Sequence, residues 1–220
     1  MYIACGRDVA AIPLRAHAGT PGHGHSHTHA DASKTCEMHV LHAHTSVDSN
    51  AGILTIHISK CRTLLIAGYD DKSIVSWDLT ANSGQVAGIF KLRKKPQNIT
   101  TATYNAPSNN GVYSSVVLVS DKFGEVYALN MDLTKAVMIT GHSTSVITDM
   151  LCCAAGNITA PLITTTASTS SSGSGSPSNL TADNLLITSD RDEKIRVSFF
   201  PAAHVIHTYC LHHRYVICDV

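Results

Sequence analysis

Residues Asp190–Lys194 place five charged side chains in succession, and Arg196 follows two residues later. Asp in a tight turn accepts hydrogen bonds from nearby backbone N–H groups, so we expect one or two of these carboxylates to stabilise the turn itself. The other carboxylates, with Lys194 and Arg196, are candidates to face a partner, because Arg binds a carboxylate through two parallel hydrogen bonds. The alternative is a solvated turn, whose exposed ion pairs contribute little to stability.

A second group of charges is the most cationic stretch of the chain. It consists of Lys91, Arg93, Lys94 and Lys95, followed by Pro96. Lys and Arg supply the sequence-independent part of nucleic-acid affinity, so this stretch is a candidate for phosphate contact. Charge alone favours a solvated hairpin turn whose lysines discourage edge pairing, because four cations are a weak footprint for nucleic acid.

Histidines form the third group. Eight of the 14 lie within residues 15–50, among Gly, Ala, Ser and Thr, and four of them alternate: His23, His25, His27 and His29. An extended chain would place these four on one side, where neutral imidazoles bind Zn, Cu or Ni. The composition favours a solvated low-complexity segment over a metal site. His142 has no Ser or Cys placed with it as a catalytic triad, so we expect it to make a structural hydrogen bond.

The elements that position these residues form a repeat. Three stretches share an apolar strand, a charged turn and a return strand: Leu64–Asp78, Val116–Leu129 and Asn184–Ser198. Aligning Asp71, Phe123 and Asp192 gives spacings of 52 and 69 residues, and the second includes the Ser/Thr/Gly-rich tract 154–183. Without about 25–30 residues of that tract, the period is near the ~40–45 residues of one four-stranded propeller blade. Gly141-His142 and Trp77-Asp78 match the two dipeptides of that repeat. The sequence therefore predicts an all-β protein, an incomplete WD40-type β-propeller.

Composition narrows the class of protein. Only 15% of residues are charged and the formal net charge is zero, so there is no bulk electrostatic argument for nucleic acid or membrane. No apolar run reaches the ~18–20 residues that span a bilayer. The first 15 residues lack a basic region followed by an adequate apolar core, so we expect no secretory signal. The seven cysteines have no regular spacing, which favours reduced thiols over disulfides or zinc. With no nucleophile–base pair and no glycine-rich phosphate loop, we expect a protein that is not an enzyme.

We divide the chain into three segments. Residues 1–14 are expected to begin a first blade, residues 15–50 to be the His-rich low-complexity segment, and residues 51–220 to form blades, with 154–183 as a disordered insertion. This amounts to roughly three and a half blades, and the last strand, Tyr215–Val220, would begin another. A propeller is stabilised by closing its ring, so we expect the chain to be a fragment of a longer protein.

The segment SDRDEKIRVS, with Gly141-His142-Ser143 and Ile147-Thr148-Asp149 upstream, resembles the WD-repeat, non-catalytic subunit of the eukaryotic tRNA (guanine-N7-)-methyltransferase. VLVSDKFGEVYAL is similar to the preceding blade of that family. The resemblance extends over Leu64–Val220 and is poor over residues 1–60. Leu129 and Ser198 depart from the repeat, which has Trp at those positions.

The resemblance implies a seven-bladed scaffold in a heterodimer with a separate catalytic subunit. That partner binds S-adenosylmethionine and methylates tRNA at guanine 46, so no cofactor is expected on this chain. It also implies a nuclear location, no membrane, and a partner surface at Asp192, Lys194 and Arg196, with tRNA reached through the complex. The alternative function is a generic WD-repeat adaptor for protein–protein interaction.

Overall fold

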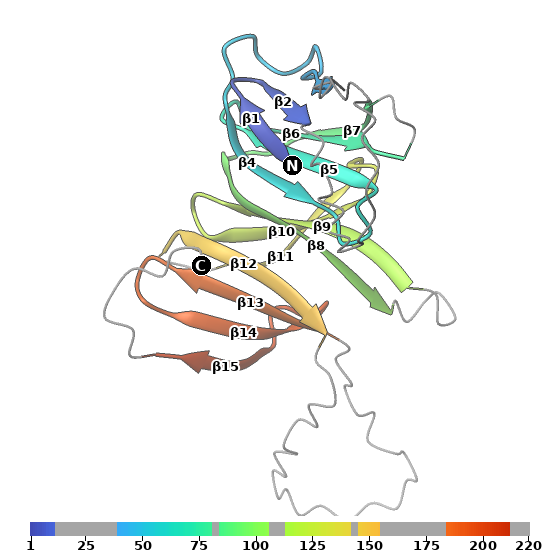
Figure 1. Cartoon of the computed structure of the whole chain (residues 1–220). Helices are drawn as coiled ribbons and strands as arrows, with labels where there is room; N and C mark the ends of the chain where they lie inside the picture. The colour runs from blue at the N-terminus through green and yellow to red at the C-terminus, as the bar shows by residue number, and fades with distance from the viewer. Residues whose placement is uncertain (12–38, 81–83, 106–112, 142–144, 155–183, 212–220) are drawn as a thin grey trace, which may run out of the picture.

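The computed structural model describes residues 1–11, 39–80, 84–105, 113–141, 145–154 and 184–211. These residues form 15 strands in four antiparallel sheets (Figure 1). The first sheet has three strands, β1 (Tyr2–Cys5), β2 (Asp8–Ala11) and β3 (His39–Leu41). The second contains β4 (Ile53–Ile58), β5 (Leu64–Tyr69), β6 (Ser73–Asp78) and β7 (Gln85–Lys91). The third contains β8 (Pro96–Asn105), β9 (Tyr113–Asp121), β10 (Glu125–Asn130) and β11 (Ala136–Gly141). The fourth contains β12 (Ile147–Ala154), β13 (Asn184–Asp190), β14 (Ile195–Phe200) and β15 (Ile206–Cys210).

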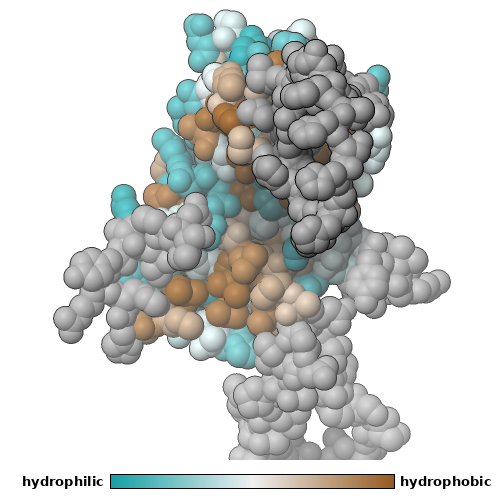
Figure 2. Space-filling view, viewed as in Figure 1, coloured by the Kyte–Doolittle hydropathy of each residue, from teal (hydrophilic) through white to brown (hydrophobic). Residues whose placement is uncertain are grey.

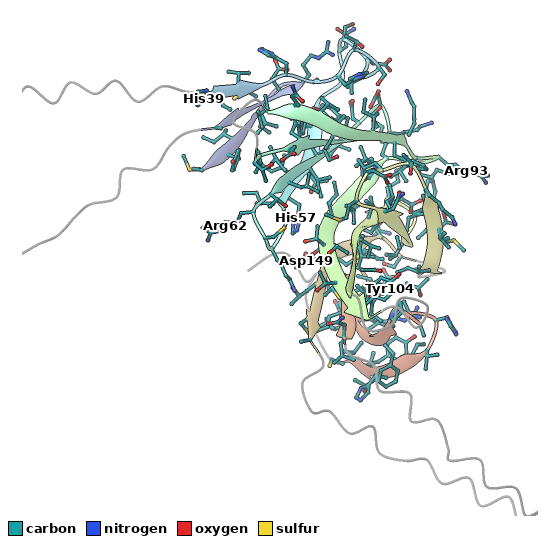
Figure 3. The ribbon with its side chains drawn as sticks, turned by 90° about the vertical axis from the view of Figure 1, so that its right-hand side faces the viewer. His39, His57, Arg62, Arg93, Tyr104 and Asp149 are labelled. Carbon is teal, nitrogen blue, oxygen red and sulfur yellow. The ribbon has the colours of Figure 1, made fainter. Side chains whose placement is uncertain are left out.

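Each four-stranded sheet is one up-and-down blade, and successive blades pack face to face. Their first strands lie side by side, β4 against β8 and β8 against β12. Polar side chains join them: His57 Nε2 lies 3.2 Å from Thr101 Oγ1, and Asn98 Nδ2 donates to Asp149 Oδ1 at 2.9 Å (Figure 3). The predicted incomplete β-propeller is confirmed.

The second strand of each middle blade is buried on both faces. On β5, Leu65 and Ala67 pack toward the first sheet with Trp77, whereas Ile66 packs toward the third sheet with Val117 and Val119. On β9, Leu118 packs in the opposite direction, against the fourth sheet. A strand covered on both sides reads as a continuous apolar run instead of an alternation, which explains the sequences LLIA and VVLV.

The three hairpin tips share one backbone geometry. Asp71, Phe123 and Asp192 are each the second residue after a strand ends, which confirms the predicted alignment. The next residue has a positive φ in every tip, +78° at Lys72, +83° at Gly124 and +64° at Glu193. Only Gly adopts this region without steric cost, so two of the three tips hold a side chain in an unfavourable conformation.

The N-terminal part of the chain forms a sheet of its own. The two short strands expected within residues 1–14 are β1 and β2. The first sheet continues with β3, which lies inside the predicted low-complexity segment 15–50 and brings Leu41 into the core. The alternating histidines at 23–29, His142, the insertion from 155 onward and the strand 215–220 lie outside the described residues.

Replacing Gly124 with Ala should lower the free energy of unfolding by about 1–2 kcal/mol, because a Cβ disfavours φ +83°. Gly52→Ala is the matched control, since Gly52 has no positive φ and a Cβ there would meet nothing within 4 Å. Urea denaturation of the purified chain measures both. Equal losses in the two variants would contradict the role of the left-handed conformation.

Candidate functional site

The hairpin tips and the turns between blades lie at one end of the sheets. Lys122 N donates to Lys95 O at 3.1 Å, which joins the tip of the third blade to the turn between β7 and β8. Arg191 N donates to Val146 O at 3.0 Å, which joins the tip of the fourth blade to the segment before β12. The two charged groups found in the sequence therefore belong to one surface, which we call the tip surface (residues 70–72, 91–95, 122–125 and 191–194).

The cations of the turn at 91–95 have different roles. Lys91 Nζ lies 3.6 Å from Asp71 Oδ2, and Lys95 Nζ lies 3.8 Å from Asp70 Oδ2. Burial opposes ionisation of Asp71, but hydrogen bonds from Ser73 and from the Asp48 backbone, with the charge of Lys91, lower its pKa below the ordinary value. Two of the four cations predicted to contact phosphate are thus engaged with the neighbouring tip.

Arg93 and Lys94 form no ion pair with any described residue, and the same is true of Lys122 on the adjacent tip. Lys94 Nζ lies 4.5 Å and Lys122 Nζ 5.3 Å from the centroid of the Phe123 ring. Phe123 is 52% exposed. Two ammonium groups therefore converge on one exposed aromatic ring.

A pocket of about 570 Å³ lies beside this ring, between the outer strands of the second and third blades. Arg93 and Lys94 form part of its wall, Glu125 and Tyr127 come from β10, and Met138 from β11. Tyr127 Oη donates to Glu125 Oε2 at 2.5 Å. Burial and the Glu125 carboxylate raise the pKa of Tyr127 to about 12, and the Arg93 guanidinium opposes that rise. Figure 3 shows Arg93 at the outer side, away from His57 and Asp149.

The hairpin at 190–194 has one structural carboxylate. Asp190 Oδ1 accepts a hydrogen bond from Lys194 N at 3.0 Å, and Asp190 N donates to Lys194 O at 2.9 Å, so this Asp closes the turn as expected. Asp192 is exposed and Lys194 is half-buried. These two charges remain on the tip surface, where a partner can reach them.

Arg196 lies inside the molecule, although the sequence favoured an outward, ion-pairing role. It is 8% exposed. Its Nε donates to Ser198 Oγ at 3.0 Å, Nη1 to Gly141 O at 3.2 Å and Nη2 to Ala203 O at 3.1 Å. The guanidinium thus ties the third blade to the fourth, and β14 turns its polar residues inward while Ile195 and Val197 lie on the opposite face.

The small size of Ser198 explains why the Arg196 side chain can lie inside the molecule. Trp77 stands six residues after Asp71, is fully buried and donates from Nε1 to His42 O at 3.1 Å. Leu129 and Ser198 hold the corresponding positions in the next two blades, as the sequence indicated. Because Ser198 is much smaller than Trp, the same side of β14 has room for the Arg196 side chain.

Asp121 is a buried carboxyl group with one unsatisfied oxygen. Asp121 is the last residue of β9, just as Asp190 is the last residue of β13, and its side chain is fully buried. Its Oδ1 accepts hydrogen bonds from Phe123 N at 2.8 Å and Glu125 N at 3.1 Å, whereas Oδ2 has no partner among the described residues. Burial raises the pKa of Asp121, and the nearby Glu125 carboxylate adds to the rise. The two backbone hydrogen bonds oppose this rise but do not cancel it.

The described residues contain no group of three His, Cys, Asp or Glu side chains that could hold a metal ion. They include no helix suited to crossing a membrane. The five cysteines among them, at positions 5, 61, 152, 153 and 210, form no disulfide.

Sequence reasoning missed three residues of this site, namely Phe123, Glu125 and Tyr127. Phe123 was detectable, because an aromatic side chain inside a charged turn has no core to enter. The residues of the pocket wall were not detectable from the sequence, because the pocket depends on how β7 packs against β10 and β11.

Comparison with known proteins identifies relatives for parts of the chain. Residues 161–219 match the family described as the tRNA methyltransferase TRM82 WD40 domain. The chain is 35% identical over 104 residues to the tRNA (guanine-N(7)-)-methyltransferase non-catalytic subunit wuho of Drosophila willistoni, covering 46% of this chain and 18% of that protein. It is 62% identical over 29 residues to the protein of the same name from Drosophila mojavensis, covering 13% and 8%. The chain thus matches less than a fifth of the length of either relative.

Solved structures support the fold. A chain of the mitotic checkpoint complex aligns with a TM-score of 0.56 at 9% identity, covering 98% of this chain and 49% of that one. The β-propeller domain of Cps50 (Swd1) from Myceliophteria thermophila aligns with a TM-score of 0.52 at 9% identity, covering 82% and 47%. The predicted resemblance to the WD-repeat non-catalytic subunit is confirmed. The names of both relatives agree with the expectation that the chain is not catalytic.

Replacing Arg196 with Ala should lower the free energy of unfolding by about 2–4 kcal/mol, because two backbone carbonyls lose their donor and a cavity opens between blades. Arg196→Lys should lose less, since one ammonium group replaces part of the network. Arg191→Ala, on the exposed side of the same hairpin, is the control and should change stability by less than about 0.5 kcal/mol. Urea denaturation gives the three values, and a neutral Arg196→Ala would contradict the inter-blade role.

Asp121 should make stability depend on pH. Its pKa is raised in the folded state, so its stabilising contribution is complete below the ordinary carboxyl pKa and is lost as pH rises through the folded pKa. Asp121→Asn keeps an acceptor for the two backbone N–H groups and should remove this decline. Denaturation curves at a series of pH values test this, with Asp192→Asn as the control for loss of an exposed carboxylate. An unchanged pH profile in Asp121→Asn would contradict the assignment.

Proposed function

We propose that this chain, which is similar to TRM82-type WD-repeat subunits, binds and stabilises the catalytic subunit of a tRNA (guanine-N7) methyltransferase. Through that heterodimer it would support N7-methylguanine formation at guanine 46 of tRNA. The observation that carries the proposal is the family match over residues 161–219, which includes the charged hairpin 190–194. S-adenosylmethionine would bind to the partner, and the complex would act in the nucleus.

Asp192 and Lys194 are the proposed partner contacts. Both side chains lie on a tip whose backbone is fixed by Asp190, so little conformational entropy is lost when a partner binds. Asp192 and Lys194 carry opposite charges close together in the sequence. Such a pair requires a complementary pattern of charges on the partner and disfavours incorrect registers. Arg196 would act indirectly, as a positioning residue that holds β14, and thus the tip, against the third blade.

Reversing the two tip charges should disrupt the complex. In the full-length protein, Asp192→Lys with Lys194→Glu should reduce co-purification of the catalytic subunit by about tenfold or more, because like charges at a desolvated contact cost several kcal/mol. Lys72→Glu reverses a charge at the corresponding tip of the second blade and should leave recovery unchanged. The measurements are recovery of the methyltransferase subunit and the level of N7-methylguanine in tRNA.

The same experiment separates the alternative function. If depletion of the protein leaves tRNA N7-methylguanine unchanged and a partner other than a methyltransferase is recovered, the chain is a generic WD-repeat adaptor. Undiminished recovery of the catalytic subunit after the double reversal would instead place the contact elsewhere on the propeller.

A further inference from the structure

The pocket beside Phe123 and its unpaired cations are not used by the partner contacts proposed above. Arg93, Lys94 and Lys122 are exposed and have no carboxylate partner among the described residues, whereas Lys91 and Lys95 are neutralised by Asp71 and Asp70. Positive charge therefore accumulates at one place on a chain whose formal net charge is zero. An anionic ligand would relieve the repulsion between the two ammonium groups that flank Phe123.

The shape and chemistry of the pocket restrict that ligand further. A volume of about 570 Å³ is within the range of about 300–1,000 Å³ that is typical of small-molecule sites. The lining combines the cations Arg93 and Lys94 with the apolar Met138, the aromatic Tyr127 and the acidic Glu125. A ligand that fits has an anionic group at one end and a flat body with hydrogen-bond donors at the other.

We propose that this site holds one unpaired nucleotide of a single-stranded RNA segment. Its phosphates contact Arg93 and Lys94, its base enters the pocket against Tyr127 and Met138, and Glu125 accepts a hydrogen bond from the exocyclic amino group of the base. The neighbouring base lies on Phe123, since aromatic side chains that stack on bases are the common device for binding single strands. The proposed function supplies tRNA as the source of that segment.

An acidic protein segment is the other class of anionic ligand, and the pocket fits it less well. Arg93 and Lys94 would attract its carboxylates, but Glu125 in the pocket lining would repel any carboxylate that entered the pocket. A nucleotide avoids this conflict, because its negative charge is on the phosphate and its base presents amino donors to the carboxylate.

The test uses the full-length protein in complex with its catalytic subunit and two probes, fluorescent eight-nucleotide cytidine and uridine strands. Cytosine has an exocyclic amino group where uracil has a carbonyl, so the unaltered protein should bind the cytidine strand more tightly. Arg93→Ala with Lys94→Ala should weaken binding about tenfold and reduce the slope of log K against log salt by roughly 1.4, the value for two lost phosphate contacts on a single strand. Glu125→Gln should abolish the preference for cytidine, because an amide can donate or accept.

Lys95→Ala is the matched control, since it removes one charge from the same turn at a residue paired with Asp70. Its affinity should stay within about twofold, and a thermal unfolding curve for each variant excludes misfolding. Equal loss in Lys95→Ala, or no preference between the strands, would overturn the proposal. The proposal would also be overturned if an oligo-glutamate peptide displaced the RNA and if binding of that peptide were weakened by Arg93→Ala with Lys94→Ala.

Recovery of the catalytic subunit with the same variants separates this inference from the proposed function. Normal recovery with weakened RNA binding supports both. Normal recovery with unchanged RNA binding overturns the nucleotide site alone. Loss of the subunit from Arg93→Ala with Lys94→Ala would assign this surface to the protein partner and overturn the nucleotide site.

Discussion

The structure depends on the burial of both faces of the second strand in each middle blade. Leu65 and Ile66 are neighbours on β5, yet they belong to two different cores, one on each side of the sheet. Val117 and Leu118 divide in the same way on β9. Because roughly 25 cal/mol is gained per Å² of apolar surface removed from water, a strand buried on both faces contributes more hydrophobic stabilisation than one covered on a single face. Each blade is thus stabilised mainly by its neighbours, as is usual for repeat proteins.

This dependence explains the hydrophobic surface at the end of the array. Among the residues that the structure describes, the fourth sheet packs against another sheet on one face only, and its first strand leaves Leu151 52% exposed. In Figure 2, hydrophobic atoms gather in the lower half of the view, where Figure 1 places β12 and β13. By contrast, the tips between blades are polar, and their conformation is fixed by Asp carboxylates that accept backbone N–H groups. Apolar burial therefore determines how blades stack, while carboxylate hydrogen bonds determine the shape of the surface that partners meet.

The sequence was sufficient to predict the repeat, the class of fold and the alignment of the three tips, because these follow from strand-length apolar runs and turn residues at fixed offsets. It was insufficient for Arg196. Alternation along β14 showed that Arg196 and Ser198 share a face, but both faces of a blade strand can be buried, so periodicity could not decide which one faces a core. The division of the cationic turn was equally hidden, because Lys91 meets Asp71 only through the pairing of β6 with β7, and Lys95 meets Asp70 only through the path of the turn that leads to β8.

The third blade differs from the second in the polar groups at its tip. Lys91, the last residue of β7, pairs with Asp71 at the tip of its own blade. The Asp121 carboxyl group of the third blade accepts two backbone N–H groups through Oδ1, but Oδ2 has no partner among the described residues, and burial raises the pKa of the group. The tip of the third blade thus combines a buried polar defect with the exposed Phe123 ring and the two cations that contact it, whereas the tip of the second blade carries its own ion pairs.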